Sequence, residues 1–202
     1  MSAGRKRAFD RDEALKSAMQ VFWRKGYIGA SMSELTQNMG INKPSLYGAF
    51  GNKETLFVEA TRRYIEDIAS RHLACLHEAG VPLATRLKNF MHSALRMQCA
   101  TKHPMGCYVV LCQSEIAAGD MPEEAASLLN EAGEATQARL TELFRTDPEA
   151  RALGLADDAE SKALCLATTL RGTASMARAG QSIDDLEKVI EHSLAGIGLD
   201  HS

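Results

Sequence analysis

The sequence predicts an all-α protein of about nine helices. Glycine and proline are scarce, with 15 and 5 of the 202 residues, and alanine and leucine are frequent, which favours helices over strands. Apolar residues recur every three to four positions through most of the chain, as they do along one face of a helix. Apolar residues make up 45% of the sequence, which is enough for a packed core.

The first predicted helix covers residues 10–25. It carries an apolar stripe on one face, and Gly26 is expected to end it. The stripe consists of Leu15, Ala18, Met19 and Phe22.

The second predicted helix covers residues 31–40. Ser31 is followed three residues later by Glu34, which is a capping box that satisfies free amides at a helix start. Gly40 suits the left-handed conformation that ends a helix and turns the chain.

The third predicted helix covers residues 42–50, with Asn42 as its cap and Pro44 in its first turn, where a missing amide costs little. Leu46 and Phe50 are expected to face inward, so the small and polar residues between them point outward. Two short helices joined by a tight turn present side chains to a DNA major groove in this way. The first fifty residues therefore predict a three-helix helix-turn-helix head.

Six further helices are predicted for the rest of the chain, separated by glycine, proline and polar breaks. The residues around Asp147, Pro148 and Gly154 are expected to form a loop. In the last two helices, small residues (Ala163, Ala167 and Ala174) oppose branched ones, which permits close packing. These faces are either core or a dimer interface. The expected ranges are 53–77, 83–100, 107–118, 123–144, 157–179 and 183–197.

The stretch from Arg11 to Phe57 resembles the N-terminal domain of the TetR/AcrR family of bacterial transcriptional regulators. The run GINKPSLY at 40–47 is also similar to a sub-branch that includes a copper-responsive repressor. One departure is Gly48, where the family often has histidine or another large residue. The resemblance rests on the run FWRKGY at 22–27, the helix at 31–40, and Leu46, Tyr47, Phe50, Lys53, Glu54 and Leu56.

The resemblance implies a DNA-binding domain over residues 1–52 and a helical effector-binding and dimerisation domain over 53–202. It implies a homodimeric repressor that binds a palindromic operator in double-stranded DNA and is released by a small-molecule effector. Two heads related by a two-fold axis read two half-sites, which one short helix cannot do.

The candidate DNA contacts lie at the predicted helix starts and on the third helix. Lys43 suits guanine or a phosphate, and the hydroxyl of Tyr47 suits a phosphate oxygen. A glycine at position 48 lets the backbone approach DNA closely. Arg5 to Arg7 form a basic arm that follows the DNA backbone, enters the minor groove or is an ordinary charged terminus. The full candidate set is Ser31, Ser33, Lys43, Pro44, Ser45, Tyr47, Gly48 and Lys53.

A mostly apolar cavity with a few polar groups is the expected form of an effector site. Met and aromatic residues at helical spacing are more often core, so solid packing is the alternative for most of the candidates. The candidates are Phe90, Met97, Cys107, Tyr108, Leu111, Glu115, Thr168 and Arg171.

Cys99, His103, Cys107 and Cys112 lie close together in the sequence. Their thiols are either small buried hydrophobes, sensors of oxidants or electrophiles, or ligands of copper(I) or zinc. Their spacing matches no strong zinc signature, so no metal or cofactor is predicted.

The net charge of -3 is unevenly spread. Residues 1–50 hold eight Lys or Arg against four Asp or Glu, and the remainder holds fifteen against twenty-two. A basic head on an acidic body suits a protein that touches DNA with one end.

Two alternatives to a DNA-binding regulator remain: a helical interaction module that does not bind DNA, and an enzyme with Cys107 as nucleophile. The second lacks any catalytic motif, so no enzyme is predicted.

No apolar run approaches the roughly 20 residues that span a bilayer. The N-terminus is polar and lacks a signal-peptide core, and five cysteines in irregular spacing do not suggest a secreted disulfide framework. A cytoplasmic protein without a membrane partner is expected.

Overall fold

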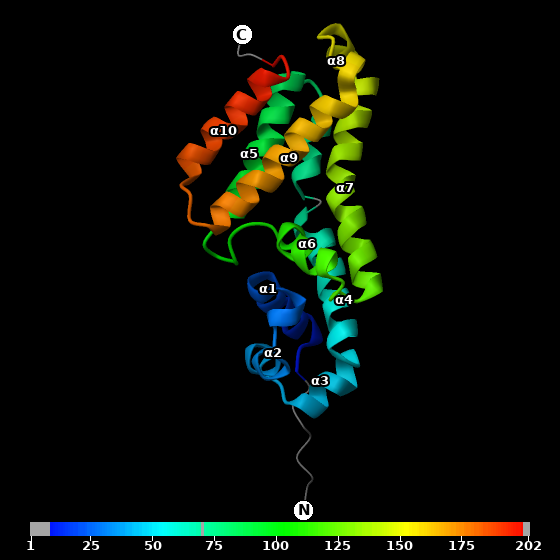
Figure 1. Ribbon diagram of the computed structural model, residues 1–202, viewed down its shortest axis with the longest axis vertical. Helices are drawn as coiled ribbons and strands as arrows, with labels where there is room; N and C mark the ends of the chain where they lie inside the picture. Colours follow the sequence, from blue (N-terminus) through cyan, green and yellow to red (C-terminus); the bar gives the residue numbers. More distant parts are fainter. Residues whose placement is uncertain (1–8, 70, 200–202) are drawn as a thin grey trace, which may run out of the picture.

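In the computed structural model, residues 9–69 and 71–199 are described, and they form helices and no strands. The all-α prediction is confirmed. The molecule is elongated, with α1 (Arg11–Gly29), α2 (Met32–Met39) and α3 (Lys43–Phe50) gathered at one end (Figure 1). We call these three helices the head and the rest of the chain the body. The basic arm predicted at Arg5 to Arg7 lies outside the described residues.

The head contains the three predicted helices, although α1 does not end at Gly26 as expected but kinks there and continues to Gly29. Asp10 caps α1, Ser31 caps α2 and Asn42 caps α3, each through a side-chain oxygen that accepts backbone amides. Because α1 and α2 are both amphipathic, their apolar faces meet the inward side of α3. The shared core includes Phe22, Leu35, Leu46 and Phe50, none of which is more than 2% exposed.

The helix predicted over 53–77 is regular only in its first half. The α4 helix (Lys53–Tyr64) is followed by a π-helical segment, η1 (Ile65–Ala69), and by a 3₁₀ segment, η2 (Arg71–His77). The expectation of one continuous helix is wrong. Segments of π- and 3₁₀-helix have poorer hydrogen-bond geometry than an α-helix, and within longer helices they often occur at functional sites.

The body consists of long helices that pack along one another (Figure 1). Of these, α7 (Glu123–Thr146) packs on α9 (Ala159–Arg178), and α5 (Leu83–Cys99) packs on both α9 and α10 (Ile183–Gly196). The shorter α6 (Tyr108–Ala118) crosses between the head and these helices, where it contacts α1, α7 and α9.

A short helix, α8 (Pro148–Ala152), and a 3₁₀ turn, η3 (Ala156–Asp158), replace the loop predicted around Asp147 and Gly154. The sequence signal for α8 was present, since Asp147 caps it and Pro148 occupies its first turn. Asp147 also pairs with Arg86 of α5 at 2.7 Å, and this ion pair is nearly buried. The contact therefore ties the end of α7 to α5.

The small residues predicted to line one face of α9 lie inside the chain's own core. Ala163, Ala167 and Ala174 are at most 3% exposed. They let α9 approach α5, α7 and α10 closely, so the core interpretation holds for these residues. None of the described helices has the length and apolar character needed to cross a membrane.

Candidate nucleic-acid interface and its connection to the body

The turn between α2 and α3 is built from local contacts. Gly40 takes φ 65° and ψ 27°, the left-handed conformation predicted for it. The Asn42 side chain accepts the amide of Ser45 at 2.8 Å, which fixes the first turn of α3. Since Leu46 and Phe50 anchor the inner side of α3, its other side is held facing solvent.

The outward side of α3 carries most of the predicted DNA contacts. Lys43, Pro44, Tyr47 and Gly48 are exposed, and Ser45 is half-buried. Tyr47 is 50% exposed, a large fraction for an aromatic side chain. This surface therefore offers a cation, a phenol and a bare stretch of backbone, a combination suited to a nucleic acid.

Three further candidates lie at helix starts. Ser31 and Ser33 are exposed at the beginning of α2, and Lys53 is half-buried at the beginning of α4. The Lys53 ammonium sits 4.5 Å from the ring centre of Tyr27. Burial lowers the pKa of Lys53, with the Glu115 carboxylate opposing that effect. Lys53 thus has a packing role within the chain in addition to any role at DNA.

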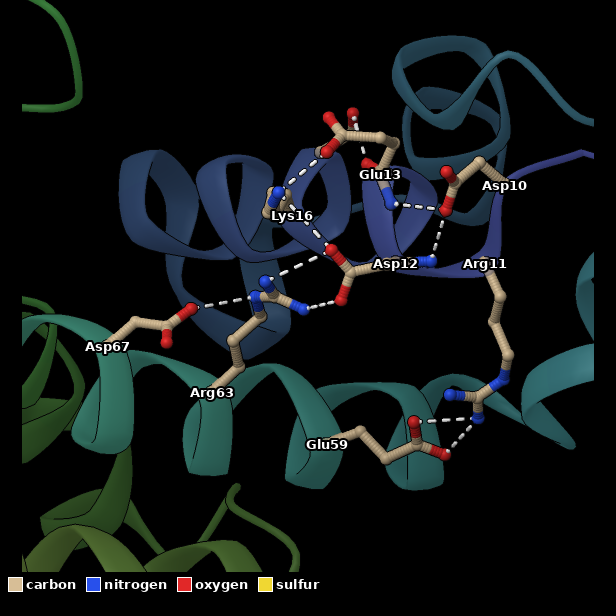
Figure 2. A network of polar contacts seen from close by, with 9 residues as sticks. Asp10, Arg11, Asp12, Glu13, Lys16, Glu59, Arg63 and Asp67 are labelled. Atoms are coloured by element: carbon tan, nitrogen blue, oxygen red, sulfur yellow. Dashed lines mark hydrogen bonds and ion pairs between the residues drawn. The ribbon is translucent and has the colours of Figure 1, made fainter.

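Ion pairs fix α1 on α4, as Figure 2 shows. Arg63 of α4 pairs with Asp12 near the start of α1 and, at 3.0 Å, with Asp67 of η1. Arg11 pairs with Glu59 at 2.8 Å and lies 4.4 Å over the ring centre of Phe50 in α3. Arg11 therefore connects α1 to both α4 and α3.

At its other end α1 meets the body at a contact region that we call the joint, formed by Trp23, Gly26, Tyr64, Glu115 and Arg178. Gly26 has φ 74° and ψ −173°, which interrupts α1 before its last turn. The Glu115 carboxylate of α6 accepts the amides of Tyr27 at 2.8 Å and of Ile28 at 3.0 Å. A Cβ atom on Gly26 would overlap that carboxylate.

Arg178, the last residue of α9, completes the joint. Its guanidinium donates to the carbonyl oxygens of Trp23, at 3.1 Å, and of Arg24. The break in α1 exposes carbonyl groups before Gly26 and amide groups after it. The body thus places a cation on the former and an anion on the latter, which matches the helix dipole at each terminus.

Aromatic rings fill the interior of the joint. Trp23 packs edge-on against Tyr64, with ring centres 4.9 Å apart, and stacks on His103 at 4.5 Å. Tyr64 in turn stacks on Tyr108 at 5.0 Å. Burial raises the pKa of both tyrosines well above the ordinary value, so both hydroxyls stay protonated at neutral pH.

A cavity of about 110 Å³ lies above the joint, between η2, α5, α6, α7 and α9. Its polar groups are few: Gln98 donates to the carbonyl of Leu170 at 3.0 Å, and Arg171 donates to that of Gly133 at 2.7 Å. The Tyr64 hydroxyl lies 3.4 Å from the Cys107 sulfur at the cavity wall. The cavity wall thus connects through Tyr64 to Trp23 in the head.

The predicted effector residues fall into two groups. Phe90, Met97, Cys107 and Arg171 line the cavity. The other four lie elsewhere: the Tyr108 hydroxyl bonds to Thr61 at 2.9 Å, Leu111 is half-buried, Glu115 belongs to the joint, and Thr168 is exposed. Tyr64, His72 and Gln98 line the cavity but were missed, because only the fold brings η2 and α5 together with α6.

The cysteines are free thiols. Cys112 is fully buried, and burial raises the pKa of its thiol far above the ordinary range. Burial also raises the pKa of Cys99, and the Glu187 carboxylate adds to that effect. Among the described residues no three His, Cys, Asp or Glu side chains gather as metal ligands would.

A capped helix pair with an exposed second helix, set on a helical body with an internal cavity, defines a helix-turn-helix regulator of transcription. The model of the family described as "Bacterial regulatory proteins, tetR family" matches residues 14–60. A solved structure of the TetR family transcriptional regulator CifR is 34% identical over 95% of this chain and 98% of that one, with a TM-score of 0.74. This chain belongs to the TetR family.

Two other relatives are similar to the chain. The repressor ComR of Escherichia coli is 35% identical over 109 residues, or 54% of this chain, so the chain spans about half the length of that relative (52%). The reduced form of E. coli NemR shares the fold, with 21% identity over 91% of this chain and 94% of that one and a TM-score of 0.76. CifR is named as a transcriptional regulator, and ComR is named as a helix-turn-helix transcriptional repressor.

Proposed function

We propose that this chain is a homodimeric transcriptional repressor that binds a palindromic operator through α3 and leaves it when a small molecule enters the body. The observation that carries this proposal is the outward side of α3, where Lys43, Tyr47 and Gly48 stand exposed on a rigidly capped helix. The CifR structure contains 26-base-pair double-strand operator DNA, which supports the same role for this chain. An operator in a bacterial chromosome implies a cytoplasmic location.

A second copy of the chain is needed to read two half-sites. Leu164 and Met176 of α9 and Val189 of α10 are 47–49% exposed, although they are large apolar residues. Such residues on neighbouring helices suit an interface between two copies. Sedimentation velocity at micromolar concentration tests this point, since a monomer there would contradict the homodimer.

We place the boundary between the DNA-binding domain and the effector-binding domain between residues 52 and 53, and this boundary separates two functions. Residues before it contact the operator, and residues after it bind the effector and the second copy. It is not a division of the hydrophobic core, because one buried cluster runs from Leu35 of the head to Leu129 of α7.

Operator binding is tested by fluorescence anisotropy with the DNA upstream of the chain's own gene, at two salt concentrations. Lys43→Ala is expected to weaken binding by about 1–3 kcal/mol if the ammonium contacts a base, or to reduce the salt slope by about one if it contacts a phosphate. Lys188→Ala is the matched control, since it removes the same charge from an exposed position on α10. Absence of any salt-sensitive binding to duplex DNA would favour an interaction module instead.

A second candidate is a regulator that responds to oxidation, and the observation that favours it is the position of Cys107 in the cavity wall. Hydrogen peroxide would transfer one oxygen atom to the Cys107 thiol, giving a sulfenic acid, and its other oxygen would leave as water. Cys112 is less suited, because its raised pKa keeps it protonated and a thiol is a poor nucleophile. If peroxide releases the unmodified protein from DNA but not Cys107→Ser, this candidate gains over a non-covalent effector.

A further inference from the structure

A second hollow, which we call the cleft, lies between the head and the body and has a volume of about 500 Å³. Its walls come from α1, from η1 and η2, from α5 and from the loop after α5. Four cationic side chains and one carboxylate line it: Lys16, Arg71, Arg96, Lys102 and Asp67.

The charges in the cleft are not balanced. Lys16 pairs with Asp12 and Glu13 of its own helix, and Asp67 pairs with Arg63, as Figure 2 shows. Arg71, Arg96 and Lys102 have no ion pair with a carboxylate among the residues that the structure describes. The only carboxylate of the cleft wall is thus already engaged, which leaves a cationic surface suited to an anion.

The cleft adjoins the apolar cavity, since His72 and Met97 line both. His72 is held by a 2.8 Å hydrogen bond between its Nδ1 and the Ser93 hydroxyl. Its other ring nitrogen, Nε2, is buried and has no hydrogen-bond partner among the described residues. Burial lowers the pKa of His72, and the nearby Arg71 and Arg96 lower it further.

We propose that the cleft and the cavity together bind one amphiphilic anion, with its short apolar tail in the cavity and its carboxylate or phosphate head beside Arg71 and Arg96. A cavity of about 150 Å³ holds one benzene molecule. By that measure the cavity accepts a tail of about four or five carbon atoms. His72 and Met97 lie where the tail meets the head.

This ligand is the effector of the proposed function, and its regulatory effect rests on that function. The cleft is bounded on one side by α1 and on the other by η1, η2 and α5. An anion drawn to Arg71 and Arg96 would therefore act on the irregular segment that follows α4, and α4 is tied to the head through Arg63 and Glu59 (Figure 2). Ligand binding would change the position of α3 only if it favours one arrangement of these segments over another.

The probes are hexanoate and pentyl phosphate, with hexan-1-ol as the neutral match of hexanoate, in which CH₂OH replaces the carboxylate on the same five-carbon tail. Trp23 is the single tryptophan, and it stacks on His103 in the cleft wall, so its fluorescence reports binding. We expect at least one of the anions to bind about tenfold or more tightly than hexan-1-ol, because charged hydrogen bonds add to the burial of the tail. Whichever anion binds more tightly shows whether the site prefers a carboxylate or a phosphate.

Three variants locate the site. Arg71→Gln with Arg96→Gln removes two exposed cations and should abolish the preference for the anion while leaving hexan-1-ol binding unchanged. Arg139→Gln is the matched control, because it removes an exposed arginine that lies outside the cleft. Ala132→Leu narrows the cavity and should weaken all three probes.

Equal binding of hexanoate, pentyl phosphate and hexan-1-ol would overturn the proposal, and so would binding of none of them. An anion preference that survives in Arg71→Gln/Arg96→Gln would also overturn it. Operator binding is measured separately without ligand, so a failure of the repressor function is distinguished from a failure of the ligand site.

Discussion

The outward side of α3 and the joint are built from opposite kinds of contact. At the start of α3 the supporting hydrogen bond is local, because the Asn42 side chain accepts the amide of Ser45 three residues ahead, and the outward side chains touch solvent. Only at its far end does a distant residue take part, where Arg11 of α1 donates to the carbonyl of Ala49 at 3.3 Å. In the joint, Glu115 bonds to Tyr27 across 88 positions of the chain, and Arg178 bonds to Trp23 across 155. The turn and the cap of α3 are set by short-range sequence, whereas the joint exists only in the finished fold.

The difference suits two tasks. A surface that reads DNA works best when it is rigid on its own, because disorder in α3 would have to be removed on binding. A region that transmits a signal must instead depend on distant parts of the molecule. The joint meets this need, since α6 and α9 each carry residues of the cavity wall as well as Glu115 or Arg178.

The largest expected effect concerns the aromatic packing of the joint. Trp23→Ala should destabilise the protein by about 3–5 kcal/mol, because the side chain is fully buried between Tyr64 and His103. Since one buried cluster spans head and body, we expect a single unfolding transition to move as a whole. Urea unfolding followed by circular dichroism at 222 nm measures it.

Ile28→Ala serves as the control for Trp23→Ala, because Ile28 in the same helix is 55% exposed and should cost within about 0.5 kcal/mol. Two separate transitions, with only one displaced by Trp23→Ala, would show that the head folds independently of the body.

A smaller effect is expected at the ionic part of the joint. Glu115→Ala should lower the stability by about 1.5–3 kcal/mol, since it leaves the amides of Tyr27 and Ile28 without their charged acceptor. It should also change operator affinity, although Glu115 lies on α6 and not in the head. Denaturation and anisotropy measured on the same samples check both expectations.

Glu134→Ala is the matched control, because it removes an exposed carboxylate from α7. If Glu115→Ala lowers the stability but leaves operator affinity unchanged, the joint is only a structural contact. It would then not connect the body to the DNA-binding surface of α3.

The sequence predicts the locally determined parts of the fold well and the long-range contacts poorly. Capping residues and turn glycines act within a few positions, so Ser31 and Gly40 identify the two ends of α2 correctly and Asn42 identifies the start of α3. The long helix expected after Lys53 fails at Tyr64, because an apolar repeat does not reveal where π- and 3₁₀-turns replace α-turns. Glu115 was predicted to line the effector cavity. Its carboxylate instead accepts a backbone amide that the break in α1 at Gly26 leaves without a helical partner.

Gly48 gives the smallest expected effect and the sharpest test of the reading surface. It lies inside α3, and a Cβ atom placed on it meets nothing within 4 Å. Alanine is better than glycine in a helix by about 0.5–1 kcal/mol, so Gly48→Ala should stabilise the protein by that amount. If the backbone of α3 approaches DNA closely at this position, the added methyl group should weaken operator binding several-fold.

Gly48→Ala would thus stabilise the fold and weaken the function, a combination that a purely structural glycine does not produce. Gly196→Ala is the control, because Gly196 ends α10 in equally open space and should leave operator binding unchanged. If Gly48→Ala binds the operator as tightly as the unmodified protein, the DNA does not come close to that part of α3. The contacts must then be carried by the other candidate residues, among them Tyr47 and, in the first turn of α3, Lys43 and Pro44.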